Sequence, residues 1–556
     1  MKKNKKRLLC LALAIVMLLG VFSGCTKKDT NNDGEVSSDE QTDIKDKTDS
    51  KDDNSEASDD ALKLPIVDKP LKLSLYSSLH PTEAKYVNNL DENEAIKKVQ
   101  EITGIDIEFI HPPVGQEEEQ FNIMVASGEL PDIVKGFFDS YYKGGVEAAM
   151  NDGLLINVND LVEQHAPNFK KDVLSNELYN KLVKADDGTI IRFGATVIPT
   201  LDGEKGRAYV GPVLRKDLLD ELGLEVPETI DEWYKVLTAF KESGKVKIPL
   251  AWAHKDWDTI VHAGNFIGAY GVNNSFYREG ETVKYGPIES GYKDFLLTFN
   301  KWYNEGLLDP DFATHGYWDN LTPMLMAGDV GSACIHLWEY RTYYETVIQK
   351  ENPKAELVVA PYTVLNKGDK FNFADSYHGL SGGLYITTSC KHPVEATKLI
   401  DFSYTPEATR MMNWGIEGVT YDMVDGKPQR TKEMEENHME MTYKYTSFVF
   451  RGFVYWDQND SQYPYDLQHQ AWDVWSDSTI KGVLPQGMIK TEEESTKFGS
   501  VMTEIESYVD EMFLKFIMGL EPIDKFDEYV AQVKSMGIDD AIKIQQDSLD
   551  RYNARK

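Results

Sequence analysis

Alternation of apolar and polar residues predicts strands and helices in turn over the first part of the chain. Residues 71–76 and 105–110 alternate with a period of two, so each is a predicted strand. Residues 94–102 and 117–126 carry apolar side chains at helical spacing, and a glycine that can end a helix follows each closely. Residues 132–134 form a short buried strand. This order indicates βαβ units around a parallel sheet, which is an α/β fold.

The same alternation recurs farther along the chain. Predicted strands cover residues 209–214 and 247–253, and predicted helices cover residues 216–222 and 229–243. Residues 504–551 are strongly helical. Because no short internal repeat accompanies this pattern, two α/β modules fit the sequence better than one.

The N-terminal residues predict export across a membrane. Four lysines and Arg7 precede an apolar run over residues 8–21, which is short for a membrane span and typical of a signal peptide. The run ends in Phe22-Ser23-Gly24-Cys25, which resembles the lipobox of bacterial lipoproteins. We therefore predict a lipoprotein signal peptide over residues 1–24 and a lipidated Cys25. An ordinary signal peptide with an incidental cysteine is the alternative.

The segment after Cys25 is almost free of apolar residues. Residues 26–60 have no aromatic side chain and consist mainly of Asp, Ser, Lys, Thr, Asn and Glu. Such a chain cannot bury enough apolar surface to fold, so residues 25–61 are predicted to form a disordered acidic tether. Asp29, Asp33 and Glu40 match the spacing of an EF-hand loop, but no helix-forming segment flanks them. We attribute the match to composition and predict no metal.

Composition narrows the range of partners. The chain has 92 acidic and 59 basic side chains, a formal charge of −33, and 41% hydrophobic residues, which suffices for a large core. This acidity argues against nucleic acid and against anionic membrane surfaces, since both attract basic proteins. Four cysteines exclude a disulfide framework. Of these, Cys334 and Cys390 belong to the folded part, where they either pair or remain free thiols.

Several segments, in order along the chain, resemble one known family. They are residues 127–133 (SGELPDI), 214–219 (LRKDLL), 222–233 (LGLEVPETIDEW), 413–421 (NWGIEGVTY) and 529–552 (YVAQVKSMGIDDAIKIQQDSLDRY). These motifs are similar to those of extracellular solute-binding proteins (family 1) of ABC importers, in the LplA-like lipoprotein branch. The segments lie in the order expected for that family, and the resemblance extends over roughly residues 71–551.

The resemblance implies a two-lobed, periplasmic-binding-protein-like clamshell of type II, with hinge crossovers between two α/β lobes. It places residues 62–200 plus 360–388 in an N-terminal lobe and residues 201–359 plus 389–556 in a C-terminal lobe. It implies a monomer that binds an oligosaccharide, uses no cofactor, catalyses no reaction and delivers its ligand to the transmembrane subunits of an ABC permease. With the lipid anchor, this predicts a protein on the extracytoplasmic face of the cell membrane.

Sugar recognition suggests which residues would line the cleft. Indole and phenol rings cover the apolar faces of a pyranose, while carboxylates, hydroxyls and imidazoles read its hydroxyl groups. Residues just after predicted strands are candidates because α/β sheets bind ligands there, and residues 413–421 contribute two more by resemblance. The predicted ligand-binding residues are Ser77, Asp139, Trp252, His254, Trp257, Trp338, Trp414, Glu417 and Trp456.

One motif match is set aside, and two alternative functions stay open from the sequence. Residues 379–383 match the GxSxG pattern of hydrolases, but β-rich sequence follows them where a nucleophile elbow needs a helix, so we interpret these glycines as part of a hinge or cleft strand. The ligand could instead be a peptide, or the protein could be a secreted glycosidase or polysaccharide lyase. An anionic uronate ligand would require Arg207, Arg215 or Arg451 in the cleft.

Overall fold

The computed structural model describes residues 62–198, 208–255, 257–261, 265–374, 379–475, 478 and 480–555, apart from the side chains of Trp456 and Asn459. These residues belong to one contact unit, Ser58–Lys556. The predicted signal peptide, Cys25 and the predicted tether lie outside the described residues. Within the described part of the chain, every helix is too short or too polar to cross a bilayer.

The first sheet has six strands and contains the predicted βαβ units. Its strand order is β14 (Gly452–Phe453), β4 (Phe193–Ile198), β11 (Gly379–Ile386), β3 (Ile133–Lys135), β1 (Leu71–Tyr76) and β2 (Ile105–Ile110). Strand β1 pairs in parallel with both β2 and β3, as the sequence predicts. Strand β11 runs antiparallel to β3 and β4 because it enters the sheet from the other direction.

Eleven helices belong to the part of the chain around this sheet. They are α1 (Glu94–Thr103), α2 (Glu117–Ser127), α3 (Phe137–Ser140), α4 (Gly145–Asn151), α5 (Asn159–His165), α6 (Pro167–Phe169), α7 (Glu177–Val183), α13 (Pro393–Phe402), α14 (Pro406–Trp414), α15 (Lys432–Glu436) and α16 (His438–Tyr445). Neighbouring β1 residues point to opposite faces, so Leu75 packs with α1 and α13 in one core while Tyr76 packs with α2 and α3 in another.

Residues 396–450 contribute to the first core, although the predicted boundaries assign them to the second lobe. Leu399, Met412 and Phe450 are all buried against strands of the first sheet. Helix α13 contacts α5, and α14 contacts α1. The hydrophobic pattern shows that these helices need a buried face, but it does not show which of two cores supplies it. The exact lobe boundaries stay a prediction.

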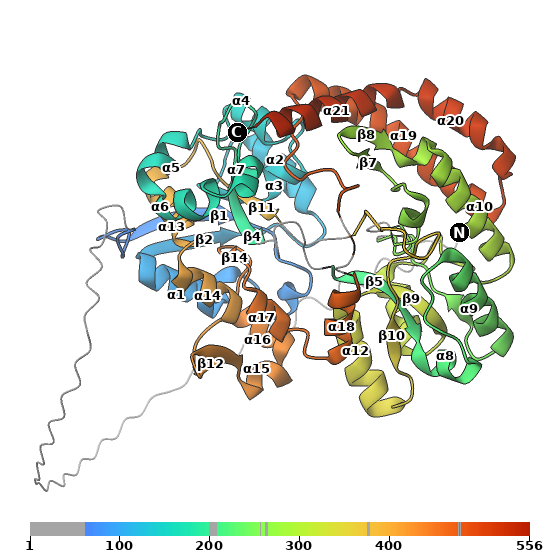
Figure 1. The fold of residues 1–556 in the computed structure, drawn as a ribbon. Coiled ribbons are helices and arrows are strands. Elements are labelled where there is room, and N and C mark those ends of the chain that lie inside the picture. The colour runs from blue at the N-terminus through green and yellow to red at the C-terminus, as the bar shows by residue number, and fades with distance from the viewer. Residues whose placement is uncertain are drawn as a thin grey trace, which may run out of the picture. The chain divides into compact units, whose positions relative to one another are not determined.

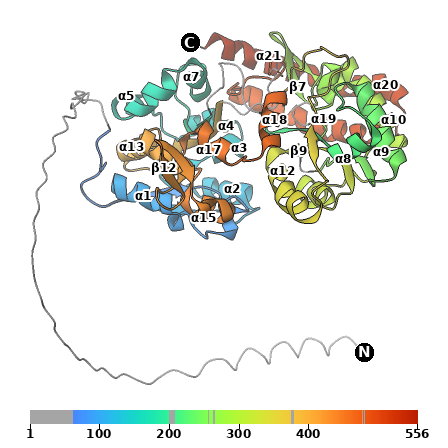
Figure 2. The same cartoon turned by 60° about the horizontal axis from the view of Figure 1, so that its bottom comes forward.

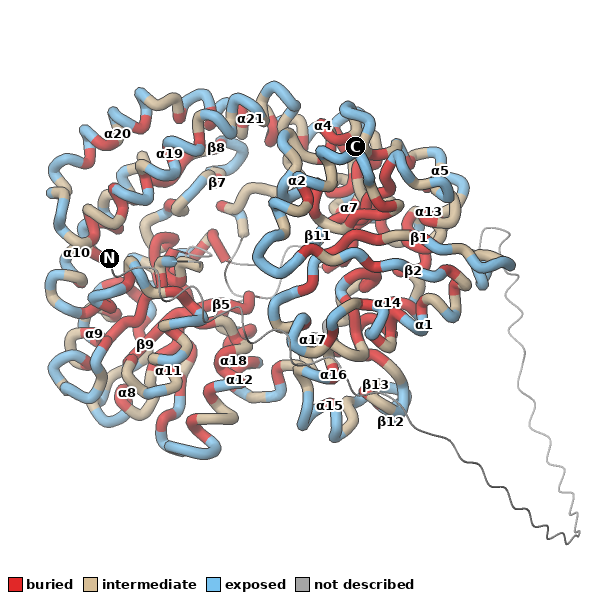
Figure 3. Tube along the Cα trace, turned by 180° about the vertical axis from the view of Figure 1, so that it is seen from behind, coloured by how far each residue is buried: buried red, intermediate tan, exposed pale blue. Residues whose placement is uncertain are grey.

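The second sheet has four strands in the order β10 (Leu357–Val359), β5 (Val210–Arg215), β9 (Val330–His336) and β6 (Ile248–Leu250). Figure 1 shows β5, β9 and β10 with α8 (Lys216–Leu222) and α9 (Ile230–Ser243) beside them. Strands β5 and β9 are buried along almost their whole length, as the red colouring in Figure 3 shows. Strand β6 is shorter than the predicted 247–253 because the chain leaves the sheet after Leu250.

The C-terminal helices cover the second core. Helix α10 (Ser290–Asn304) lies against α19 (Glu492–Met518), which also contacts α20 (Phe526–Ser535) and α21 (Ile538–Ala554). Figure 2 shows the same helices grouped from a second direction. The remaining helices are α11 (Thr322–Met326), α12 (Leu337–Tyr343), α17 (Trp456–Ser461) and α18 (Asp466–Trp475). The predicted helical stretch 504–551 is thus three helices, separated where Gly519 and Gly537 adopt positive φ.

Small elements complete the fold. Two hairpins consist of β7 (Phe276–Glu279) with β8 (Thr282–Tyr285), and β12 (Tyr421–Val424) with β13 (Lys427–Arg430). Short 3₁₀ helices cover η1 (Glu83–Lys85), η2 (Leu90–Glu92), η5 (Ile267–Tyr270), η6 (Gly286–Ile288) and η9 (Ile523–Lys525). Short π-helical segments cover η3 (Lys170–Leu174), η7 (Tyr317–Leu321) and η8 (Tyr344–Glu351).

The chain passes between the two sheets more than once. It leaves the first sheet after β4, returns to it between β10 and β11, and leaves it again after β14. Such crossovers bring strand ends from both sheets to the same place without any sequence proximity. The α/β fold with two sheets and hinge crossovers is therefore confirmed.

Candidate functional site

A cavity of about 320 Å³ lies where residues from both sheets meet. From the first sheet it is lined by Lys135, Thr196, Ile198, Ser381 and Gly382, and from the strands of the second sheet and their flanks by Tyr209 and His336. Phe448, Arg451, Val454 and Tyr463 complete the lining. We call this space the cleft cavity. Both sheets contribute strand ends to it, and strand ends of open α/β sheets are where ligands bind.

The glycine-rich pattern of residues 379–383 lies in this wall. Ser381 and Gly382 belong to β11, which continues as a strand to Ile386 and pairs with β4. Gly382 has φ of 66°, a conformation that favours glycine. A nucleophile elbow needs a helix directly after the serine. The interpretation of this segment as a cleft strand is confirmed.

Two basic side chains give the cleft cavity a positive character. Arg451 is only 8% exposed, and its buried Nε has no hydrogen-bond partner among the described residues. Its guanidinium lies 4.3 Å from the ring centroid of Phe448. Burial lowers the pKa of Arg451 to about 10, so the group stays charged at neutral pH. No ion pair joins it to a carboxylate of the described residues.

Lys135 ends β3 and supplies the second charge. Burial lowers the pKa of Lys135 to about 8, with Glu83 opposing this change and Arg451 adding to it. Glu83 is itself buried, and burial raises its pKa, although nearby Lys135 works in the opposite direction. The cleft cavity is therefore lined by two cations, and the carboxylate of Glu83, which influences Lys135 from outside the lining, is pushed by burial toward its neutral form.

Aromatic rings form another part of the lining of the cleft cavity. The rings of Tyr209 and His336 are stacked with centroids 5.9 Å apart, and Tyr209 also contacts Tyr463 at 5.4 Å. Phe448 is 42% exposed, so part of its ring is open to a neighbouring molecule. Together with the hydroxyls of Thr196 and Ser381, these rings can contact both the faces and the rim of a sugar.

Other cavities lie elsewhere in the fold. One of about 390 Å³ lies between helices α7 and α21 and is lined mainly by apolar residues, including Leu182, Phe373 and Ile480. Another of about 290 Å³ contains Asp139, Arg192 and Lys490. Neither combines strand ends of the two sheets, so the cleft cavity is the candidate site.

The predicted residue Trp252 is part of the hydrophobic core. Its side chain is 0% exposed and stacks on Phe312 with ring centroids 4.1 Å apart. The indole Nε1 donates to Asp258 over 2.8 Å, so the ring is satisfied within the fold. No face of this indole is open to a ligand, because Phe312 and Phe513 cover the strand end after β6.

His254 and Trp257, in the same loop, have protein partners as well. His254 Nδ1 lies 2.6 Å from Asp258 and Nε2 lies 3.0 Å from Asp510, and these two hydrogen bonds outweigh burial and raise the pKa of His254 to about 9. Trp257 is half-buried, with its ring 4.7 Å from Tyr317 in an edge-on arrangement. The loop is thus held by an ion-pair cluster at one end and aromatic packing at the other.

Trp338 lies next to the cleft cavity without lining it. It is half-buried and contacts His438 at 5.2 Å and the cavity residue Tyr463 at 6.3 Å between ring centroids. His336, two residues earlier, is the cavity residue at this strand end. The ring nitrogen Nδ1 of His336 accepts a hydrogen bond from the backbone N–H of Trp338 and so caps the N-terminus of α12.

The residues taken from the 413–421 segment pack away from the cleft cavity. Trp414 is 4% exposed, its buried Nε1 has no partner among the described residues, and its ring contacts Tyr421 at 5.8 Å. Glu417 is exposed in the turn that follows α14. Trp456 begins α17, but its side chain lies outside what the structure describes. The ligand roles of these three residues stay predictions.

The two predicted residues beside the first sheet, Ser77 after β1 and Asp139 in α3, also lie outside the lining of the cleft cavity. Ser77 is 2% exposed, and its carbonyl oxygen lies 2.6 Å from His111 Nδ1. Asp139 forms an ion pair with Arg192 at 2.9 Å and accepts a hydrogen bond from Tyr385. None of the predicted ligand-binding residues is among the described residues that line the cleft cavity.

Sequence reasoning came nearest to the cleft with its arginines. Arg451 is the named arginine that lines the cavity, whereas Arg215 pairs with Asp217 at 2.7 Å and Arg207 lies outside the described residues. Lys135 and His336 were not among the predicted residues, although Lys135 directly follows the predicted strand 132–134. Lys135 ends β3 and His336 ends β9, so a position at a strand end was the available signal.

Cysteine and metal chemistry offer little in the described part of the chain. Cys334 and Cys390 are free thiols, and burial raises the pKa of both. Asp309, Asp311 and His315 are the one group within the described residues with metal-like spacing. His315 Nδ1 already lies 2.7 Å from Asp309, whose other oxygen accepts the N–H of Asp311. These mutual bonds account for the cluster without a metal.

Comparison with known proteins places this geometry in context. A family model described as bacterial extracellular solute-binding protein matches residues 89–410. The fructooligosaccharide ABC transporter substrate-binding protein FusA of Streptococcus pneumoniae serotype 4 (strain ATCC BAA-334 / TIGR4) is 22% identical over 507 residues, covering 84% of this chain and 88% of FusA.

A second relative and a solved structure cover the chain to a similar extent. The polygalacturonan/rhamnogalacturonan-binding protein YtcQ of Bacillus subtilis (strain 168) is 23% identical, covering 84% of this chain and 89% of YtcQ. The crystal structure of the alginate-binding protein AlgQ2 without calcium ion is 25% identical with a TM-score of 0.69, covering 87% of this chain and 99% of that one. The predicted two-lobed clamshell fold is confirmed.

Proposed function

The chain belongs to the bacterial extracellular solute-binding protein family, and we propose that it captures an oligosaccharide in the cleft cavity and delivers it to an ABC permease. The observation that carries this proposal is a cavity whose walls come from both sheets and combine aromatic rings, hydroxyls and cations. The names of FusA and YtcQ, which describe oligosaccharide and polysaccharide binding, support the class of ligand.

The lining suggests how such a ligand would be held. Phe448 offers a partly open ring for the apolar face of a sugar, while Thr196 and Ser381 offer hydroxyls for its rim. A ligand that contacts both sheets favours the conformation in which both contacts form at once. The permease would then recognise the liganded conformation through surface residues. The predicted residue Trp338 would extend the site through its contact with Tyr463.

Anchoring is proposed from the sequence. The basic start, the apolar run and Cys25 support a lipoprotein held on the extracytoplasmic face of the membrane by a lipidated cysteine, with residues 25–61 as a tether. We propose a monomer, because one chain supplies both walls of the cavity.

Catalysis is the less favoured function. Glycoside hydrolysis uses two carboxylates that flank the scissile bond. Among the described residues that line the cleft cavity, none is Asp or Glu. A peptide ligand is the remaining alternative, and no feature of the cavity favours an extended backbone.

A binding screen tests the proposal. The purified protein without its signal peptide is incubated with neutral and acidic oligosaccharides and with peptides of similar length. We expect a raised melting temperature with one oligosaccharide class and recovery of that ligand unchanged by mass spectrometry. Shortened products would show an enzyme, and a shift with peptides alone would overturn the sugar assignment.

A further inference from the structure

The cleft cavity contains more positive charge than the protein around it compensates. Arg451 is only 8% exposed. Even so, its Nε has no hydrogen-bond partner and its guanidinium has no ion pair among the described residues. Its guanidinium lies 4.3 Å from the ring centroid of Phe448. A buried charge without a carboxylate partner is costly, because it loses its hydration and a contact with an aromatic ring recovers only part of that loss.

Lys135 adds a second cation to the same lining. The described residues offer its ammonium group no hydrogen bond or ion pair, and the one carboxylate that influences it is the buried Glu83. Lys135 and Arg451 repel each other, since the presence of Arg451 lowers the pKa of Lys135.

The overall charge makes this local arrangement more informative. The chain carries a formal charge of −33, so its surface as a whole repels anions. Within the described part of the chain, the lining of the cleft cavity has no carboxylate, while it has two cations. A neutral sugar could accept hydrogen bonds from both cations but would leave their charge uncompensated. A carboxylate or sulfate could accept two parallel N–H bonds from the guanidinium and neutralise it.

We infer that the cleft takes an acidic oligosaccharide and that Arg451 and Lys135 bind an anionic group on one of its sugar rings. This inference rests on the proposed function, because it names the class of oligosaccharide. A uronic-acid carboxylate and a sulfate ester share the required chemistry. The carboxylate is a planar group that a guanidinium can bind through two parallel N–H bonds, and the guanidinium of Arg451 lies 4.3 Å from the ring centroid of the partly exposed Phe448.

The test uses pairs of ligands that differ only in charge. Isothermal titration calorimetry compares uronic-acid trisaccharides of several linkages with the same trisaccharides after methyl esterification of their carboxyl groups. A sulfated galactose trisaccharide forms a third arm and separates the two sources of negative charge. We expect at least one acid to bind and its methyl ester to bind about 10- to 100-fold more weakly, the range for hydrogen bonds to charged groups.

Variants connect the preference to the two cations. In Arg451→Gln and Lys135→Met the acid and its ester should bind with more nearly equal affinity, whereas Arg451→Lys should keep part of the preference. Arg430→Gln is the matched control, because Arg430 is also enclosed, has one Nη2 without a partner among the described residues and a pKa lowered by burial to about 10, but does not line the cavity. Its acid-to-ester ratio should be unchanged.

The outcomes separate the two levels of the proposal. Equal binding of acids and esters by the unaltered protein, or binding of neutral oligosaccharides alone, overturns the acidic class while leaving sugar capture in place. An unchanged acid-to-ester ratio in both variants overturns the assignment to Arg451 and Lys135. A preference for the sulfated sugar supports the anion site and identifies sulfate as the group. Binding of no sugar from any arm overturns the acidic class, and the screen with neutral oligosaccharides then decides the proposed function separately.

Discussion

Two pairs of basic side chains in this protein have opposite surroundings. Arg551 and Arg555, near the end of α21, form the pair that we call the clasp, and Lys135 and Arg451 form the pair in the cleft cavity. Both pairs join parts of the chain that are far apart in sequence. They differ in the number of carboxylates and carbonyls that face them, and this difference indicates a structural role for one pair and a ligand role for the other.

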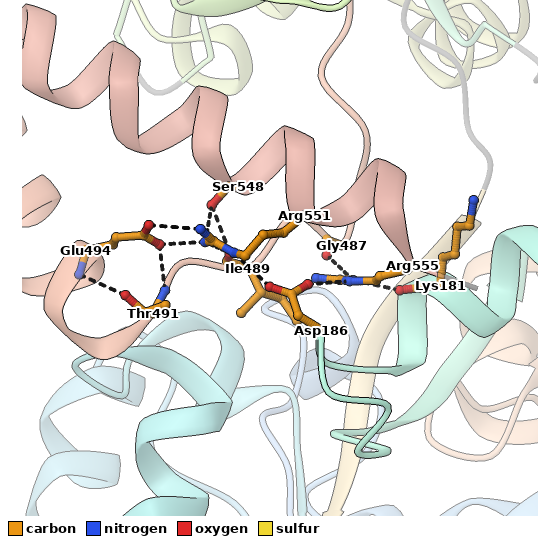
Figure 4. A network of polar contacts seen from close by, with 9 residues as sticks. All are labelled: Lys181, Asp186, Gly487, Ile489, Thr491, Glu494, Ser548, Arg551 and Arg555. Atoms are coloured by element: carbon orange, nitrogen blue, oxygen red, sulfur yellow. Dashed lines mark hydrogen bonds and ion pairs between the residues drawn. The ribbon is translucent and has the colours of Figure 1, made fainter.

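The clasp is almost fully satisfied, as Figure 4 shows. Arg551 bonds Asp186 at 2.8 Å and Glu494 through two nitrogens at 2.9 and 2.5 Å. Arg555 bonds Asp186 at 2.6 Å and the carbonyl oxygens of Lys181 and Gly487. One Nη2 of Arg555 has no partner among the described residues, but Asp186 matches its charge. Although burial acts in the other direction, Arg551 holds the pKa of Glu494 below its usual value.

The partners of the clasp come from different parts of the fold. Asp186 follows α7, which contacts β4 and β11 of the first sheet, whereas α21 contacts α19 and β8 beside the second sheet. The clasp thus links a helix of one core to the surroundings of the other. In the cleft cavity, the same residue type has an aromatic ring and an open space in place of carboxylates. A matched cation holds the fold, and an unmatched cation leaves binding energy for a guest.

The largest expected effect comes from breaking the clasp. Asp186→Ala removes the carboxylate shared by Arg551 and Arg555 and leaves two partly buried guanidinium groups with less compensation. Because Asp186 is 29% exposed, we expect a loss of about 3 kcal/mol in the free energy of unfolding, the lower end for a broken buried ion pair. Urea denaturation followed by tryptophan fluorescence measures it.

Asp106→Ala is the control for this change, because Asp106 is exposed in β2. It should alter the free energy of unfolding by no more than about 0.5 kcal/mol. If the two variants were equally stable, the clasp would contribute nothing measurable to the free energy of unfolding. The proposed structural role of Arg551 and Arg555 would then be wrong.

An effect of intermediate size is expected from the pH dependence of stability at His254, because its carboxylate partners favour the charged imidazolium. Hydrogen bonds to Asp258 and Asp510 outweigh burial and raise the pKa of His254 from 6.5 to about 9 in the folded state. The stabilisation is therefore complete below pH 6.5 and is lost as the pH rises through about 9. The whole shift corresponds to about 3 kcal/mol between pH 6.5 and pH 9.5. Because Asp510 is 62% exposed and solvent screens its charge, we expect roughly 2 kcal/mol less stability at the higher pH from this group.

The difference between His254→Asn and the unaltered protein isolates this contribution. The variant should be the less stable of the two at pH 6.5, and the gap should narrow towards pH 9.5, as measured by urea midpoints across that range. A stability difference that did not change with pH would mean that the imidazole of His254 does not change its charge in this range, and the proposed pH dependence would be wrong.

Local structure was predictable from the sequence, whereas the choice of site residues was not. Gly104 and Gly128 end α1 and α2 with positive φ, and Thr229 with Glu232 forms the capping box of α9, so these boundaries follow from neighbouring residues. Two sheets could be predicted for the same reason. Trp252 could not be recognised as core, because Phe312 and Phe513, which cover it, lie far away in the sequence.

The cleft residues depended on how the chain crosses between the sheets. Lys135, His336 and Arg451 come from β3, β9 and the residues before β14, and only the crossovers bring them to one cavity. Periodicity indicates that an element has a buried face but carries no information on the partner of that face. Residues 396–450 illustrate this limit, since their helices join the first core after the chain has already passed through the second.

The smallest expected effect is also the most direct test of the contrast between the two pairs. Arg451→Met replaces an unmatched buried cation with an apolar side chain of similar length. Because the lost charge had no carboxylate partner, we expect the ligand-free protein to become more stable by about 1 kcal/mol. The matched variant Arg551→Met should be less stable than the unaltered protein, because it leaves Glu494 without its arginine and Asp186 with Arg555 alone. Urea midpoints of ligand-free samples, checked by native mass spectrometry, give both signs. A loss of stability in Arg451→Met as large as that in Arg551→Met would make Arg451 a structural residue, and the free binding energy of the cleft would have to come from Lys135 or from the aromatic rings.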